Sequence, residues 1–165
     1  MKKHIALLLA AAILLSIAGC AGKGEKIQSP VSMYYLRSEF IYNSIDSVVA
    51  SEIRDAASFE NEARTILSAY LLGPQSDDLR SPFPKNTRLL QLTLTEDTAQ
   101  IILTNAIATL RGIHLTLACV CLARTVMELT GVQKVQISAD SEMLGGNKSI
   151  IIDSSSVHLT ESTTK

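Results

Sequence analysis

One long apolar segment, residues 113–129, dominates the sequence, and the fold depends on how that segment is buried. It is long enough for about five turns of helix, and Gly131 follows it as a predicted end of the helix. Residues 59–72 also place apolar side chains at helical spacing, after Ser58 as a predicted N-cap and before Gly73 and Pro74. Each helix has one apolar face, so both need a sheet to cover them.

Most other apolar residues follow the two-residue period of strands, and Glu96 with Asp97 predicts a tight hairpin between two of them. The predicted strands are residues 31–37, 47–54, 88–95, 99–103 and 132–139, with 149–153 as a further edge strand after a predicted turn at Gly145-Gly146-Asn147. The element order is then ββ-αββαβ. This order predicts an α/β (α+β) fold, in which a small mixed sheet of three to five strands carries both helices on one face.

The N-terminus has the features of an export signal. Lys2 and Lys3 form a basic head, an apolar run of about a dozen residues follows, and small residues precede Cys20. Ile17-Ala18-Gly19-Cys20 looks like a bacterial lipobox, in which the cysteine thiol receives a diacylglyceryl group and the chain is cut just before it. The alternative is an ordinary signal peptide with an incidental cysteine.

The predicted organisation has four parts: a lipoprotein signal peptide (1–19), a lipid anchor with a polar tether (20–30), one domain (31–153) and a flexible tail (154–165). Two acyl chains, unlike one, hold a protein stably at a membrane. We therefore expect the domain to be lipid-anchored through Cys20 at the outer face of the cytoplasmic membrane.

Charge and cysteine usage narrow the function classes. With 15 Lys and Arg against 16 Asp and Glu, the chain has no basic excess for nucleic acid, and none is expected as a partner. Cys119 and Cys121 lie two apart in the long apolar helix, where a disulfide between them is geometrically poor. We interpret them as core residues. A metal or redox pair would need a second pair of ligands, so we expect no metal and no cofactor.

The polar residues do not predict a catalytic site. His114 begins the long helix without an acidic helical neighbour, so a partly exposed surface residue is the favoured interpretation. The paired carboxylates fall at helix starts, turns and strand ends, where acids serve as caps. They are Glu60 with Glu62, Asp77 with Asp78, Glu96 with Asp97, and Asp140 with Glu142.

The connection over residues 73–86 is long for a compact domain, and long loops are often functional. Leu79 and Phe83 are its apolar candidates for contact with a partner. The alternative, which we favour, is that both side chains pack beneath the loop on the core.

Three stretches together resemble the GerMN domain of spore germination and sporulation lipoproteins from Gram-positive bacteria. They are Leu71-Leu72-Gly73-Pro74-x-Ser76, Pro82-x-Pro84-x-x-Thr87-x-Leu89-Leu90, and Leu129-Thr130-Gly131-Val132-x-Lys134-Val135-x-Ile137. The resemblance spans residues 31–140 and implies a fold similar to ring-building motifs. The stretch Leu103-Thr104-Asn105 departs from the Asp-Phe-Ser that family members often carry there.

The resemblance implies a protein that is not an enzyme and that makes protein–protein contacts in the envelope during sporulation or germination. The expected partner is another envelope protein or a second copy, for which residues 31–37 are a candidate edge strand. The alternative is a lipoprotein that binds a cell-wall fragment or small solute. The sequence has no Trp, four Tyr and three Phe, and so few aromatic residues for stacking on sugars. A small wall hydrolase is disfavoured by the lack of a catalytic motif.

Overall fold

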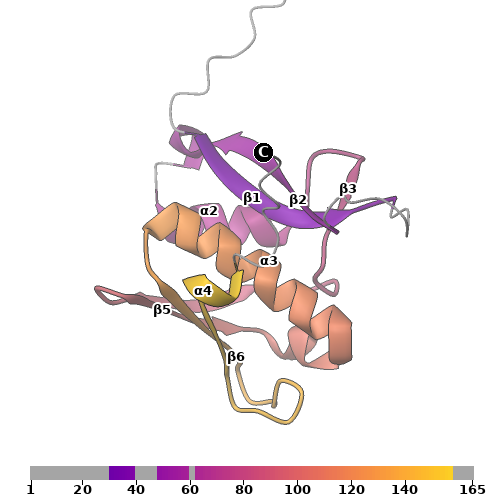
Figure 1. Cartoon of the computed structure of the whole chain (residues 1–165), viewed down its shortest axis with the longest axis vertical. Coiled ribbons are helices and arrows are strands. Elements are labelled where there is room, and N and C mark those ends of the chain that lie inside the picture. The colour runs from indigo at the N-terminus through magenta and orange to yellow at the C-terminus, as the bar shows by residue number, and fades with distance from the viewer. Residues whose placement is uncertain (1–29, 40–47, 60–61, 158–165) are drawn as a thin grey trace, which may run out of the picture.

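The computed structural model describes residues 30–39, 48–59 and 62–157, which form two sheets with helices between them. Figure 1 shows β1 and β2 above the helices and β5 and β6 below them. The predicted α+β class is confirmed. The predicted single sheet is not observed, because the strands divide into a three-stranded and a four-stranded sheet.

The first sheet has the order β2-β1-β3 and is antiparallel. Strand β1 (Pro30–Arg37) pairs along its length with β2 (Val49–Asp55), and its last two residues pair with the short β3 (Leu79–Arg80). Residues 31–37 were predicted as an edge strand for self-association. That prediction is wrong, because β1 is the central strand of this sheet.

On the edge of β1 opposite β2, only the last two residues pair with β3, and a side chain of the long helix contacts the strand before them. The Tyr34 backbone N–H donates to the Thr125 hydroxyl at 2.9 Å, and that hydroxyl donates to the Cys121 carbonyl at 3.0 Å. Helix α3 (Gly112–Thr130) therefore covers the part of the β1 edge that would have to pair with a strand of the second sheet if the two sheets were one. Thr125 is fully buried there.

The second sheet has the order β4-β5-β6-β7. Strand β4 (Leu89–Leu94) and β5 (Thr98–Leu103) form the predicted hairpin, in which the Thr95 N–H donates to the Thr98 carbonyl at 2.9 Å. Strand β6 (Lys134–Ala139) runs parallel to β5, with α3 as the crossover, and β7 (Ile150–Asp153) is the predicted edge strand. Connections of this kind place the helix against one face of the sheet.

The helices supply much of the core between the sheets. Helix α3 ends at Gly131, whose φ of +75° is the left-handed conformation that favours glycine, as predicted. It buries eight residues, among them Ala118, Leu122 and Val126. Helix α2 (Ala63–Leu71) buries Tyr70, whose ring contacts Tyr35 at a centroid distance of 4.9 Å.

The start of α2 and the predicted C-terminal tail differ from the sequence-based predictions, and short helical turns lie at both places. Helix α2 begins at Ala63 with Glu62 at the N-cap position, so the prediction of Ser58 as N-cap is wrong; the 3-10 turn η1 (Ala56–Phe59) precedes it. The turn η2 (Asn105–Thr109) leads from β5 to α3. The predicted tail begins with the one-turn helix α4 (Ser154–Val157), and residues 158–165 lie outside the described part.

Candidate functional site

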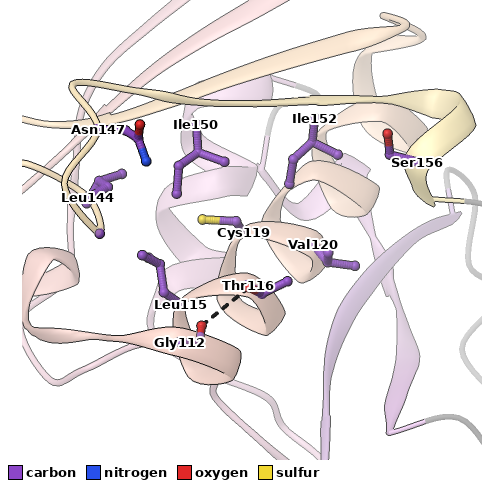
Figure 2. A pocket seen from close by; sticks show the side chains of 11 residues that line it. Gly112, Leu115, Thr116, Cys119, Val120, Leu144, Asn147, Ile150, Ile152 and Ser156 are labelled. Atoms are coloured by element: carbon purple, nitrogen blue, oxygen red, sulfur yellow. Dashed lines mark hydrogen bonds between the residues drawn. The ribbon is translucent and has the colours of Figure 1, made fainter.

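A pocket with a volume of about 530 Å³ lies between α3 and the β6–β7 hairpin. This size falls in the range of sites for small molecules. In Figure 2, Ile150 and Ile152 of β7 point toward α3, which supplies Leu115, Cys119 and Val120. The surface inside the pocket is therefore made mostly by aliphatic side chains.

A glycine turn shapes one end of the pocket. Leu144 and Asn147 exchange two backbone hydrogen bonds of 2.8 and 3.0 Å around Gly145 and Gly146, whose φ values are +57° and +91°. The turn was predicted, because glycine adopts positive φ without strain. A Cβ at Gly145 would stand 3.1 Å from the Leu115 side chain. Glycine at this position thus lets the turn lie against α3 and brings the fully buried Leu144 into the lining.

The chemistry of the pocket suits an uncharged apolar group. None of its lining residues is acidic, basic or a histidine. The polar side chains are Thr116, Asn147 and Ser156, and the Thr116 hydroxyl already donates to the Gly112 carbonyl at 3.3 Å. A wall fragment needs several convergent polar groups for recognition, so this lining does not favour the predicted alternative of a cell-wall ligand.

Cys119, on the floor of the pocket, is not an activated nucleophile. Burial raises the pKa of its thiol from the ordinary value of 9.0 to about 12, and burial raises the pKa of the Cys121 thiol to about 12 as well. Both cysteines are free and buried, which confirms their interpretation as core residues. A thiolate is the reactive form of cysteine, and these groups stay protonated at neutral pH.

We expect both thiols to resist modification in the folded protein. In a soluble fragment, residues 22–165, neither Cys119 nor Cys121 should react with Ellman's reagent at pH 8, whereas both should react in guanidinium chloride. Thiol counting with and without denaturant measures this. Two thiols that react within seconds in the native state would contradict the burial described above.

The same pKa shifts fix a pH dependence of stability. A thiol whose pKa is 9.0 in the unfolded chain and about 12 in the folded protein stabilises the fold fully only below the unfolded value. The free energy of unfolding should therefore fall as the pH rises from 9.0 toward about 12. In a double variant, Cys119→Ala with Cys121→Ala, the free energy of unfolding should fall less steeply over this pH range.

A second feature is a buried ion pair that fixes the loop after α2. The Arg54 and Glu52 side chains are 7% and 11% exposed, and the Arg54 Nε donates to Glu52 Oε1 at 2.7 Å. Arg54 Nη2 also donates to the Gly73 carbonyl at 2.6 Å, and its guanidinium lies over the Tyr35 ring, 5.9 Å from the centroid. A charged pair at this depth is held by several hydrogen bonds at once.

Glu52 completes the arrangement on the other side of the loop. Its carboxylate accepts the backbone N–H of Gln75 at 3.0 Å and that of Ser76 at 3.1 Å. Gly73 has a φ of +114°, and its carbonyl also accepts the Tyr35 hydroxyl at 3.2 Å. The Leu-Leu-Gly-Pro-x-Ser stretch is thus bound by two charged side chains of β2. Neither side chain is among the predicted site residues, although opposite charges two residues apart in a strand are a signal of such a pair.

The two predicted contact residues lie in the core rather than on the surface. Phe83 is buried and packs edge-on against Tyr70, with ring centroids 5.5 Å apart. Leu79, in β3, is partly buried against the same core. The alternative that they pack beneath the loop is the one observed. The large apolar side chain that is exposed beside this loop is Leu72, the C-cap residue of α2, at 89%.

The remaining candidate residues are not brought together. His114, Asp77, Asp78, Glu96, Asp140 and Glu142 are all exposed. Asp97 lies 4.0 Å from the Lys134 ammonium. Within the three described ranges, no group of three potential metal ligands gathers. Cys20 and Glu60 lie outside those ranges.

Helix α3 is the one helix of the described part long and apolar enough to cross a membrane. Its buried residues pack on β1 and β6, however, as expected for the core helix of a globular domain.

Comparison with known families identifies the domain. The model of the Germane family, described as "Sporulation and spore germination", matches residues 32–145, well over half of the chain. The chain belongs to this family. The GerMN resemblance inferred from the sequence is thereby confirmed, and the matched region runs from β1 to the glycine turn beside the pocket.

Two solved structures are similar to this Germane domain. One is described as a "putative lipoprotein" from Clostridium perfringens, with 22% identity over 77% of this chain and 89% of that chain, and a TM-score of 0.45. The other comprises the tandem GerMN domains of the sporulation protein GerM from Bacillus subtilis, with 17% identity and a TM-score of 0.49. That match covers 72% of this chain and 43% of the GerM chain. Comparison with curated proteins gave no significant match.

Proposed function

We propose that this chain is a lipid-anchored, non-catalytic interaction module that acts in envelope assembly during sporulation or germination in a Gram-positive bacterium. The domain would be held by Cys20 at the outer face of the cytoplasmic membrane, where it binds another envelope protein or a second copy. The observation that carries the proposal is the family match over residues 32–145, because that family is defined by sporulation and spore germination.

The Gly73 loop, residues 72–76, offers a surface suited to such a role. Leu72 exposes 89% of its surface, at a point where the neighbouring backbone is fixed by Arg54 and Glu52. Exposed leucines are common on protein surfaces. A leucine on a fixed backbone, however, loses little conformational entropy on binding, and rigid presentation of this kind favours affinity. Leu72 is therefore our candidate contact residue in place of Leu79 and Phe83.

Genetic complementation tests the proposal. Deletion of the gene in its own host should lower the yield of heat-resistant spores or slow their germination, and the intact gene should restore both. A Leu72→Ser variant should restore them less well at equal protein level. Ile113→Ser, at a residue that is 64% exposed in the first turn of α3, is the matched control and should complement fully.

A deletion strain that sporulates and germinates normally would contradict the proposed role. In that case, calorimetric titration of residues 22–165 with soluble wall fragments would test the alternative of a ligand-binding lipoprotein. A variant Leu72→Ser that complements fully would leave the role in place but would remove Leu72 as its contact residue.

A further inference from the structure

The pocket between α3 and β7 follows the helix as a narrow, elongated space. The α3 residues that line it form one stripe, which runs for about 12 Å along the helix axis. They lie at the spacings of three and four that share one helix face: Gly112, Leu115, Thr116, Cys119 and Val120. Figure 2 shows Ile150 and Ile152 of β7 facing this stripe, with Leu144 at one end and Ser156 at the other. The shape therefore suits an extended, linear ligand.

Polar and aliphatic side chains occupy different parts of the pocket. The three polar ones, on Thr116, Asn147 and Ser156, are exposed and form its rim. The aliphatic side chains and the Cys119 thiol are buried or half-buried and form its floor. Among the described residues, the lining includes neither a charged nor an aromatic side chain. This separation fits a ligand whose hydrocarbon part enters the pocket while its polar part stays in water at the rim.

A peptide segment is a poorer occupant than a hydrocarbon. Each of its residues would bring two backbone polar groups, and burying these without partners is costly. The Thr116 hydroxyl already donates to the Gly112 carbonyl, so Asn147 and Ser156 are the polar side chains that remain. The backbone groups of β7 lie in the plane of the sheet rather than in the pocket. A hydrocarbon chain needs no polar partner at all.

We propose that this pocket binds the hydrocarbon chain of a single-chain lipid, such as a fatty acid or a monoacylglycerol, with the headgroup at the rim. Burial of an aliphatic chain against aliphatic side chains is favourable in proportion to the apolar area removed from water. Because the pocket is one helix stripe wide, it takes one chain, and a two-chain lipid would leave its second chain in water. The inference goes beyond the proposed function and rests on it only for the nearby membrane that supplies the lipid.

The predicted anchor at Cys20 would be a second source of such a chain. Two acyl chains hold a protein stably at a membrane, whereas a single chain gives only marginal binding. If one chain of the anchor moved into the pocket, only the other would hold the protein. We therefore assign the pocket to a separate lipid.

Binding of a fluorescent fatty acid tests the site. Residues 22–165, which include every described residue, are titrated with cis-parinaric acid, whose fluorescence rises in apolar surroundings, below its micelle concentration. Saturated fatty acids should displace this probe. Each added methylene should tighten binding by up to about fourfold, and the gain should stop once the chain fills the pocket. Palmitate and monopalmitoylglycerol should displace it similarly, because their headgroups stay outside.

Two neighbouring isoleucines give a matched pair of variants. Ile150 faces the pocket, whereas Ile151 is 59% exposed on the opposite face of β7, since side chains alternate along a strand. Ile150→Asp should raise the dissociation constant of the probe by about tenfold or more, because a carboxylate would lie against the hydrocarbon chain. Ile151→Asp makes the same change on the other face and should leave the dissociation constant unchanged.

A second pair keeps the test decisive if Ile150→Asp does not fold, which circular dichroism would show. Thr116→Trp places a ring over the pocket from an exposed position and should abolish binding. Thr65→Trp, at an exposed threonine of α2 outside the lining, should bind like the wild type. A wild-type fragment that binds no probe, or a folded Thr116→Trp variant that binds as well as the wild type, would overturn the inference.

Two further measurements distinguish other occupants. Residues 158–165 begin two residues after Ser156, and their removal should leave the affinity unchanged; a rise of about tenfold would show that they fill the pocket and would overturn the inference. Native mass spectrometry compares the soluble fragment with the anchored chain in phosphatidylglycerol vesicles that contain palmitate. Palmitate bound to both supports a separate lipid. Palmitate on the soluble fragment alone would show that the anchor occupies the pocket.

Failure of this inference is distinguishable from failure of the proposed function. A fragment that binds no probe, from a gene whose deletion still impairs sporulation or germination, would overturn the lipid site alone. A deletion without phenotype, in a protein that binds the chain as described, would overturn the role and retain the site.

Discussion

Replacing Arg54 with alanine should lower the free energy of unfolding by about 3–5 kcal/mol, the usual cost of removing one partner of a buried ion pair. The carboxylate of Glu52 would remain buried without its cation, and the Gly73 carbonyl would lose its 2.6 Å hydrogen bond. Small domains are stable by only about 5–15 kcal/mol. The variant should therefore unfold at a much lower urea concentration than the wild type.

Urea denaturation of residues 22–165, followed by circular dichroism, measures this loss. Arg80→Ala is the matched control: it removes the same side chain from an exposed position on β3 and should change stability by no more than about 0.5 kcal/mol. Arg54→Lys should recover only part of the loss, because lysine cannot donate in a fork to both groups. A loss below about 1 kcal/mol for Arg54→Ala would show that the pair is solvated rather than buried.

Replacing Cys20 with alanine should abolish lipid attachment. The lipid requires a thiol at the cleavage position, and no other side chain of the predicted lipobox provides one. In cells fed a palmitate analogue that can be detected by a coupling reaction, the wild-type chain should carry the label and Cys20→Ala should carry none. The unlabelled precursor should also retain its signal peptide and migrate more slowly.

Cys119→Ala is the control for this experiment, since it removes a thiol that is buried in the core and leaves Cys20 in place. It should be labelled like the wild type. Label that persists in Cys20→Ala would contradict lipid attachment at this residue. A wild-type chain that is exported and cleaved without label would support the ordinary signal peptide instead.

Local patterns predicted most of the elements but not how they assemble. The run of apolar residues before Gly131 predicted α3, and the alternation around Glu96 and Asp97 predicted the β4–β5 hairpin; both are within a residue or two of the observed bounds. The division into two sheets was not predictable in this way. It depends on the contact between Tyr34 and Thr125, which are 91 residues apart. The spacing of apolar residues within one element does not predict a contact between residues so far apart in the sequence.

In the candidate site, too, local patterns predicted the turn and the loop but not which side chains meet. The glycine turn beside the pocket was predicted from local composition, since two glycines favour positive φ. Leu79 and Phe83 were identified as loop residues, but whether they pack or protrude depends on Tyr70 in another element. The pairing of Arg54 with Glu52 and with Gly73 joins β2 to a loop about 20 residues later, so a strand pattern alone did not reveal it.

The position of β1 has a mechanical consequence. Any force on the chain before Pro30 reaches the domain through β1, whose pairing with β2 extends from Pro30 to Leu36. Hydrogen bonds between strands are perpendicular to the strand direction, so the component of this force along β1 loads them in shear, together rather than one after another. On its other side, β1 is held by Thr125 of α3. The strand that first receives tension from the N-terminal side is thus built to resist it.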